Sequence, residues 1–193
     1  MAKKIQKGKA VPKATKQKPI TKAKAKKKPR PPGLNPRLGA HPPAKPGKPG
    51  IQYPYSIRKS KYGVGIFFEQ KIPKGALVWK YKAGSNSKSL NGQKEVLAYL
   101  KTFDSDNDRR LILEFAYFWE GTLNILLDDS VYCNHSDDPN TGPNENDFES
   151  CYALRDIKKG EEWFEDYGTY QYPAWYLKLM KKYKCDLSFF TIK

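Results

Sequence analysis

Short apolar runs, separated by residues that favour turns, make up most of the chain after residue 50. Tyr53, Tyr55 and Ile57 alternate with small or polar residues, which is the period of a strand with one buried face. Other short runs are rich in β-branched and aromatic residues, which are typical of strands. The pattern predicts strands over residues 53–57, 64–69, 76–81 and 148–154, with a turn at 72–75.

A longer pair of apolar segments predicts a buried hairpin. Residues 111–119 are apolar and aromatic, Glu120 and Gly121 can turn, and residues 122–127 are apolar again. Clusters of polar and turn-forming residues predict loops elsewhere. These predicted loops cover residues 84–92, 104–110 and 128–147.

Two segments carry apolar residues at helical spacing. Residues 93–103 place Val96, Leu97, Leu100 and Phe103 on one face, with Asn91 as a candidate N-cap. Residues 174–183 predict a second helix, because Pro173 suits the first helical position. Short strands outnumber helices, so the predicted fold class is mainly β with a few short helices.

Charge divides the chain into two parts. Residues 1–50 hold 16 Lys and Arg and no acidic residue, whereas residues 51–193 hold 20 basic and 20 acidic residues. Residues 1–28 lack the apolar content that offsets the entropy of ordering, and residues 29–50 contain eight prolines. We therefore predict a disordered basic tail and extended linker over residues 1–50, and one folded domain over residues 51–193.

The predicted tail has several readings. Lys-rich segments bind nucleic acid nonspecifically through the phosphate backbone. The run Lys26–Arg30 also suits a nuclear localisation patch. A solvated, nonspecifically sticky extension is the simpler alternative. Nucleic-acid binding and nuclear targeting are compatible with one another.

Cysteine content and hydropathy narrow the class of protein. Cys133, Cys151 and Cys185 are odd in number and widely spaced, which disfavours a disulfide framework and suits a reducing compartment. Cys133 and His135 lack further ligands at zinc-like spacing, so no metal site is predicted. No apolar run approaches the ~20 residues that span a bilayer, so no membrane segment or secretory signal is predicted.

Three stretches carry candidate chemistry. They are Lys61–Phe67 with its Gly-x-Gly, the turn-rich Asn134–Asn140, and Leu154–Gly168. Glycines let a backbone approach a ligand closely, and an Asn carboxamide can accept from an ammonium and donate to a carboxylate. Taken singly, the Gly-x-Gly is equally consistent with a turn, and the other two stretches are more typical of ordinary turn or core packing than of a site.

In this order and at this spacing, the three stretches resemble the SET domain of protein lysine methyltransferases. The resemblance covers roughly residues 55–170 and implies S-adenosyl-L-methionine as cofactor. It also implies a threaded, knot-like crossing of the Asn134–His135 loop with the final segment. Tyr167 matches the tyrosine that orients the acceptor amine. The residues implied to contact the cofactor are Tyr62, Gly63, Val64, Gly65, Asn134, His135 and Tyr167.

Some positions depart from the family pattern. Trp163 stands where the family often has Leu, and Glu165 stands where it often has Phe or Tyr, a position that influences how many methyl groups are added. The Cys-rich flanking modules of many histone methyltransferases have no counterpart here. Aromatic residues are instead expected to wall the substrate channel, although those after Tyr167 are equally compatible with packing of the last helix onto the sheet. The predicted channel residues are Phe115, Tyr117, Tyr132, Glu165, Tyr170 and Trp175.

The expected function is lysine N-methylation of a histone or another basic chromatin-associated protein. Such a protein is nuclear or chromatin-associated if eukaryotic and cytoplasmic otherwise, and a homodimer is compatible with the sequence. One alternative is a catalytically silent SET-like binding module that the basic tail tethers to chromatin or nucleic acid. A second is a DNA-condensing protein whose folded domain only dimerises.

Overall fold

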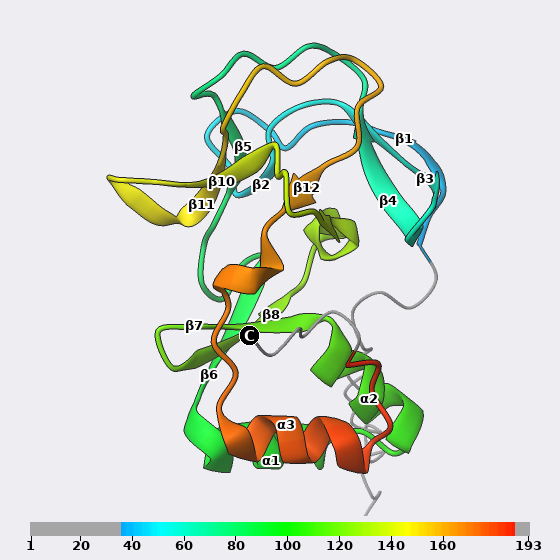
Figure 1. Cartoon of the computed structure of the whole chain (residues 1–193), viewed down its shortest axis with the longest axis vertical. Helices are drawn as coiled ribbons and strands as arrows, with labels where there is room; N and C mark the ends of the chain where they lie inside the picture. Colours follow the sequence, from blue (N-terminus) through cyan, green and yellow to red (C-terminus); the bar gives the residue numbers. More distant parts are fainter. Residues whose placement is uncertain (1–35, 188–193) are drawn as a thin grey trace, which may run out of the picture.

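The computed structural model describes residues 36–187. These residues form twelve short strands, three α-helices and two 3-10 turns, so the fold is mainly β, as predicted. Figure 1 shows two regions: an upper one of small sheets and a lower one that contains a sheet and all three helices. The expected disorder of residues 1–28 concerns residues outside the described range.

The upper region contains two antiparallel sheets. The first has the order β1-β3-β4, formed by Gly39–His41, Tyr55–Ser60 and Gly63–Phe68. The second has the order β10-β11-β5-β2, formed by Thr141–Asn144, Asp147–Ala153, Leu77–Lys80 and Gly50–Ile51.

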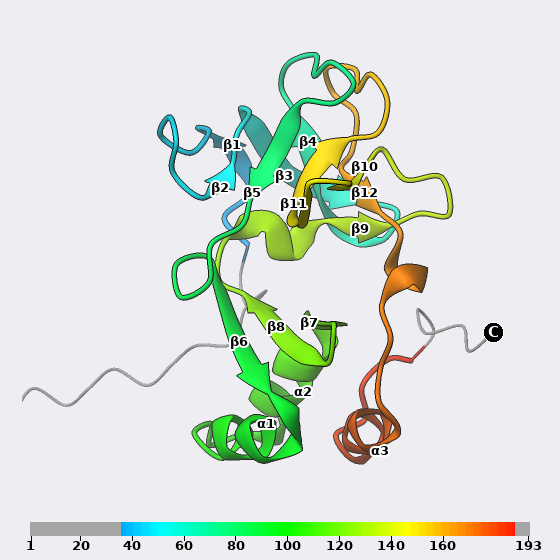
Figure 2. The same ribbon diagram turned by 90° about the vertical axis from the view of Figure 1, so that its left-hand side faces the viewer.

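The lower region packs one sheet against helices. Strands β6 (Ser87–Asn91), β8 (Thr122–Leu126) and β7 (Ala116–Trp119) pair antiparallel in that order. The helices are α1 (Gly92–Leu100), α2 (Asp106–Glu114) and α3 (Ala174–Lys182). Figure 2 shows the chain passing from the upper region through a 3-10 turn down to α3.

A short parallel pairing joins two of the stretches that the sequence singled out. Strand β9 (Asn134–His135) pairs with β12 (Phe164–Glu165), so that Asn134 lies opposite Phe164 and His135 opposite Glu165. The turn η1 (Asp129–Tyr132) precedes β9, and η2 (Tyr167–Thr169) follows β12. Residues about thirty positions apart therefore meet at one place, while the knot-like threading stays a prediction.

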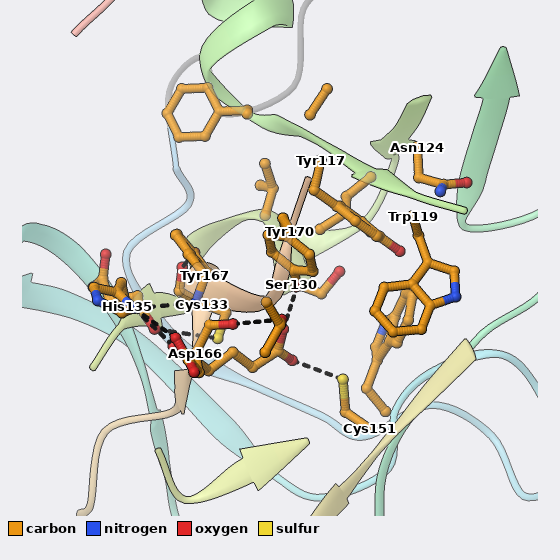
Figure 3. A pocket seen from close by; sticks show the side chains of 18 of the residues that line it. Tyr117, Trp119, Asn124, Ser130, Cys133, His135, Cys151, Asp166, Tyr167 and Tyr170 are labelled. Carbon is orange, nitrogen blue, oxygen red and sulfur yellow. Dashed lines mark hydrogen bonds and ion pairs between the residues drawn. The ribbon is translucent and has the colours of Figure 1, made fainter. Parts of the chain in front are cut away.

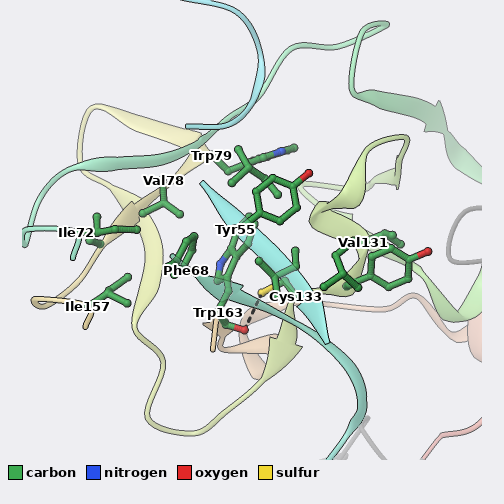
Figure 4. Close-up of a cluster of buried hydrophobic side chains, with 14 residues drawn as sticks. Tyr55, Phe68, Ile72, Val78, Trp79, Val131, Cys133, Ile157 and Trp163 are labelled. Carbon is green, nitrogen blue, oxygen red and sulfur yellow. Dashed lines mark hydrogen bonds between the residues drawn. The ribbon is translucent and has the colours of Figure 1, made fainter. Parts of the chain in front are cut away.

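Each region has its own apolar core. The upper core gathers buried side chains from β3, β4, β5 and η1, including Phe68, Trp79 and Trp163 (Figure 4). The lower core is centred on residues such as Leu113, Phe118 and Tyr176. Trp163 is 1% exposed, and its Nε1 donates to the Thr141 Oγ1 at 2.6 Å. Trp163, one of the two residues that depart from the family pattern, is thus a core residue.

We expect Trp163→Ala to lower the free energy of unfolding by about 3–5 kcal/mol, because it removes a large buried ring and leaves a cavity. Denaturant unfolding followed by circular dichroism measures this change. Trp119→Ala, at a partly exposed position, is the control. An equal loss in both variants would contradict the role assigned to Trp163.

Several predicted elements are confirmed, but each of the three predicted loops contains regular structure. The loop predicted over residues 128–147 includes η1, β9 and β10. Helix α2 occupies residues 106–114, where the sequence predicted a loop followed by a strand. The Ser105 hydroxyl caps this helix by accepting from the Asp108 N–H at 3.0 Å, and Ile112 and Leu113 are buried. The apolar run thus belongs partly to a helix and partly to a strand. Residues 87–91, predicted as loop, form β6 because Ser87 and Leu90 pair and pack against β8.

The region upstream of Ile51 also differs from the expected linker. Strand β1 pairs with β3, and Gly50 belongs to β2. The His41 ring stacks on Tyr55 at a centroid distance of 5.1 Å, which fixes β1 to the sheet. Residues 39–51 are therefore built into the upper region despite their prolines.

Helix termini also differ in detail. Asn91 occupies the N-cap position of α1, but its side chain makes no capping bond. The Glu95 carboxylate instead accepts from the Asn91 backbone N–H at 2.8 Å. Pro173 is the N-cap of α3 and precedes its first residue.

Candidate active site

A cavity of about 1060 Å³ is lined by residues from both regions. Figure 3 shows His135 and Tyr167 at one side, Tyr117 and Tyr170 near the middle, and Trp119 and Cys151 at the other side. The lining includes six of the predicted cofactor residues: Tyr62, Gly63, Val64, Asn134, His135 and Tyr167. It also includes five of the predicted channel residues: Phe115, Tyr117, Tyr132, Glu165 and Tyr170.

Asn134 is held by its amide nitrogen. The Asn134 Nδ2 donates to the Val64 carbonyl at 3.0 Å and to the Glu162 carboxylate at 2.7 Å. Its backbone N–H donates to the Trp163 carbonyl at 3.3 Å. Among the described residues, these bonds leave the Asn134 Oδ1 as an acceptor for a ligand.

Gly65 does not line the cavity, in contrast to the sequence expectation. A Cβ at this position would lie 2.0 Å from the Glu162 Oε1, so the missing side chain makes room for that carboxylate. Glu162 also accepts from the Ser60 hydroxyl at 2.9 Å. Gly65 therefore acts indirectly: its missing side chain leaves space for the Glu162 carboxylate, which accepts a hydrogen bond from Asn134. Sequence reasoning missed Glu162, although it lies inside a stretch that had been singled out.

The segment before Gly65 forms an open edge of the cavity. Gly63 has a φ of 109°, which favours glycine, and a Cβ there would meet no atom within 4 Å. Tyr62 is 40% exposed, and its ring lies edge-on to Phe164 at 5.9 Å. The backbone at this edge can approach a ligand closely.

His135 orients the catalytic candidate. Its Nδ1 accepts from the Tyr167 backbone N–H at 3.1 Å, and its Nε2 lies 3.3 Å from the Asp137 carboxylate. Its Nδ1 also lies 3.3 Å from the Glu165 carbonyl oxygen, so the ring contacts both β12 and the start of η2. The rings of His135 and Tyr167 stack at 5.5 Å, so His135 positions Tyr167 by both contacts.

Tyr167 presents a neutral phenol. Its hydroxyl donates to the Cys133 carbonyl. Burial, followed by the nearby Cys133 and Glu165, raises the pKa of Tyr167 well above its ordinary value. The hydroxyl therefore remains protonated near neutral pH, which suits a group that positions an amine and excludes a phenolate base.

Aromatic rings continue from Tyr167 into the cavity. The Tyr170 ring lies 5.7 Å from that of Tyr167 and stacks on Tyr117 at 4.9 Å. Burial raises the pKa of both Tyr117 and Tyr170, so these walls are uncharged. Trp175 is not among the lining residues: its ring packs edge-on against Phe118 at 5.7 Å, as part of the lower core.

Glu165 lies inside the same cavity, beside the aromatic rings. Its Oε1 accepts from the Cys151 thiol at 2.7 Å, and its Oε2 accepts from the Tyr170 hydroxyl at 3.0 Å. Burial raises the pKa of Glu165, while these hydrogen bonds oppose the increase. Sequence reasoning missed Cys151, because nothing local connects β11 with β12.

Negative charge predominates in the cavity lining. Six carboxylate residues line it: Glu114, Glu120, Glu149, Glu165, Asp166 and Asp186. Arg110 is the one Lys or Arg among the described lining residues, and it pairs with Glu114 at 2.9 Å. The cavity therefore favours cationic groups.

Two further searches of residues 36–187 are relevant to the class of protein. No group of three or more His, Cys, Asp or Glu residues in that range is arranged to hold a metal ion. None of the helices within it combines the length and the apolar character needed to cross a bilayer.

The SET domain family model matches residues 63–168, and the chain belongs to this family. Members are mostly protein lysine methyltransferases, and SET methyltransferases use S-adenosylmethionine. The match spans the glycine edge, the β9–β12 pairing and Tyr167. Comparison with curated protein sequences gave no match.

Three solved structures are similar to this chain at low sequence identity. A Plasmodium falciparum protein proposed to be a histone methyltransferase is 21% identical, with a TM-score of 0.39, over 65% of this chain and 99% of that one. A chain of ctPRC2, bound to S-adenosylmethionine in an autoinhibited conformation, is 22% identical, with a TM-score of 0.48. That likeness covers 72% of this chain but 17% of the ctPRC2 chain. A chain of an active polycomb repressive complex 2 is 23% identical, with a TM-score of 0.42, over 59% of this chain and 15% of that one.

Proposed function

We propose that the protein is an S-adenosylmethionine-dependent protein lysine N-methyltransferase that acts on a histone or another basic chromatin-associated protein. The observation that carries this proposal is the position of Tyr167. Tyr167 lines the cavity together with the Asn134–His135 pair and with the stacked rings of Tyr170 and Tyr117. A methyl donor bound beside Asn134 and His135 would meet a lysine bound beside Tyr117 and Tyr170 at Tyr167.

The residues on the Tyr167 side fit the cofactor. Gly63 leaves the edge of the cavity free of a side chain. The Asn134 Oδ1 can accept a hydrogen bond from the amino group of the methyl donor. We assign cofactor contact to Tyr62, Gly63, Val64, Asn134, His135 and Tyr167. The bound cofactor supplies an activated methyl group on sulfonium sulfur.

The other side of the cavity fits a lysine side chain. Phe115, Tyr117, Tyr132 and Tyr170 supply apolar walls that exclude water, and desolvation lowers the pKa of an entering ammonium. The cavity can hold the amine close to the methyl group, since oriented reactants can gain roughly 7–11 kcal/mol over free ones.

The charge distribution supports a basic substrate. Carboxylates in the lining attract Lys- and Arg-rich segments, and histone tails have that composition. Residues 1–50 add a basic segment that we expect to bind nucleic acid nonspecifically and so bring the enzyme to chromatin. If the source is eukaryotic, a nuclear location follows from this function.

Radiolabelled methyl transfer to a panel of histones and to cell lysate tests the proposed function. We expect label in a basic protein, in a band that disappears when S-adenosylhomocysteine competes. Binding of S-adenosylmethionine without transfer to any protein would favour the silent binding module. Absence of both binding and transfer would contradict the proposed function.

The basic tail should be separable from methyl transfer. Deleting residues 1–35 removes 13 of the 16 Lys and Arg side chains of residues 1–50, because only Arg37, Lys45 and Lys48 remain.

 The original amino terminus is also removed, but the shortened chain has a new one, so the net loss is 13 positive charges. The cut stays outside the described fold, because β1 begins at Gly39.

We expect this truncated protein to keep cofactor binding and peptide methylation, while its affinity for duplex DNA falls steeply and loses most of its salt dependence. Fluorescence anisotropy at several salt concentrations measures the second effect. Unchanged DNA affinity after truncation would contradict the role assigned to the tail.

A further inference from the structure

The carboxylate of Glu165 occupies an unusual position. It lies in the cavity two residues before Tyr167, on β12, opposite His135 of β9. The Cys151 thiol and the Tyr170 hydroxyl each donate to a different oxygen of this carboxylate. Two donors from separate elements therefore fix its orientation and suit its ionised form.

The groups packed against Glu165 are otherwise neutral near neutral pH. Burial raises the pKa of the Tyr117, Tyr167 and Tyr170 phenols. It also raises the pKa of the Cys133 and Cys151 thiols. Phenols and thiols that keep their protons cannot take one from a substrate, which leaves the carboxylate as the proton acceptor of this cluster.

No cation within residues 36–187 offsets the charge of Glu165. Within residues 36–187, no Lys, Arg or His forms an ion pair with it. The nearby charged groups that act on the same cluster are carboxylates: Glu162 near Cys133, Asp147 near Cys151, and Glu149 near Tyr117. A partly buried carboxylate without a cationic partner is costly, so the arrangement favours an entering ammonium.

We infer that Glu165 accepts the proton of the target lysine's ammonium, and that Cys151 and Tyr170 are the positioning residues that aim its carboxylate. This inference rests on the proposed function. It adds a proton acceptor within the channel, because a free lysine with a pKa of about 10.4 is almost fully protonated at neutral pH.

The step balances as follows. The lysine ammonium transfers one proton to a Glu165 oxygen, and the amine keeps the electron pair. That pair forms the N–C bond to the donor's methyl group, while the C–S bond breaks and its electrons stay on sulfur. The products are a methylated ammonium and a neutral thioether, and the Glu165 carboxyl then releases its proton to solvent. Burial, which raises the pKa of this carboxyl, improves its match to the lysine.

A pH profile separates this role from a purely structural one. In wild type we expect methyl transfer to a lysine peptide, measured as kcat/KM, to level off between about pH 7 and pH 9. In Glu165→Gln we expect a rate that rises about tenfold per pH unit over this range, because deprotonation must then occur in solution. The variant should be on the order of a hundredfold slower near pH 7 and approach wild type near pH 9.

Glu145→Gln is the matched control, since Glu145 is an exposed carboxylate that does not line the cavity. It should retain the wild-type profile. Parallel profiles for wild type and Glu165→Gln would overturn the inference while leaving the proposed function intact. A wild-type protein that methylates nothing would instead overturn the proposed function.

Equilibrium binding supplies a readout that needs neither turnover nor the variant. Norleucine has a side chain similar in shape to that of lysine, without the charge. We expect wild type with S-adenosylhomocysteine to bind a lysine peptide at least tenfold more tightly than its norleucine counterpart near pH 7, and to lose that preference as Glu165 is protonated at lower pH. Equal affinity for both peptides across the pH range would overturn the inference even if Glu165→Gln failed to fold.

Discussion

Tyr167→Phe is expected to lower the turnover of methyl transfer by roughly 10²–10³-fold, because it removes a hydroxyl that positions the amine in the transition state. The ring remains, so its stacking on His135 and its contact with Tyr170 are kept. The lost hydrogen bond to the Cys133 carbonyl should cost only about 1 kcal/mol of stability. Steady-state kinetics measures the loss of turnover. Calorimetric binding of S-adenosylmethionine shows whether the variant still binds the cofactor.

Tyr152→Phe is the matched control for this variant. The Tyr152 hydroxyl donates to the Asp147 carboxylate at 2.9 Å, and Tyr152 is not among the residues that line the cavity. The same chemical change should leave turnover unaltered there. A fully active Tyr167→Phe protein would remove Tyr167 from the catalytic role.

The second large effect is expected for Asn134→Ala. This change removes the Oδ1 acceptor and also releases Glu162 and the Val64 carbonyl from the amide that they share. Losing hydrogen bonds to charged groups typically costs about 1.5–3 kcal/mol, which corresponds to a roughly ten- to hundredfold weaker affinity for S-adenosylmethionine. Isothermal titration calorimetry measures this change directly.

Asn146→Ala provides the comparison, since Asn146 is exposed and lies outside the cavity lining. It should bind the cofactor as wild type does. Gly65→Ala should resemble Asn134→Ala in direction, because an added Cβ displaces the Glu162 carboxylate that holds Asn134. Unchanged cofactor affinity in Asn134→Ala would exclude this residue from the cofactor site.

Much of the fold could be predicted because its signals are local. Alternation predicted the strand that contains Tyr55 and Ile57, and helical spacing predicted α1 and α3. Helix α2 was missed because Ile112 and Leu113 continue directly into the aromatic strand β7, so that a single apolar run hides two elements. The Ser105 cap and the acidic first turn were the local signal that could have found it.

Residues of the site could be predicted where a motif contains them. Asn134, His135 and Tyr167 belong to recognisable stretches, and the cavity brings them together. The contacts that hold them are long-range, such as Glu162 against Gly65 and Cys151 against Glu165. Such contacts depend on which strands become neighbours, and local patterns in a single sequence do not predict strand neighbours.

Trp175 illustrates the opposite error. An aromatic residue soon after Tyr167 was equally compatible with a channel wall and with a packed helix. In the structure, α3 turns Trp175 toward Phe118 in the lower core. Tyr170, five residues earlier, lies before the helix and stacks on Tyr117 in the cavity. Which aromatic residue faces the cavity depends on where the helix begins.

Methyl transfer followed by mass spectrometry tests the central claim most directly. Wild type and Tyr167→Phe are incubated with histones and with S-adenosylmethionine that carries a deuterated methyl group. The proposed function predicts that wild type places the deuterated methyl on lysine nitrogen and releases an equal amount of S-adenosylhomocysteine, whereas the variant does so far more slowly. No deuterated lysine in histones or in any other protein of a cell lysate, under conditions in which the cofactor is bound, would contradict it.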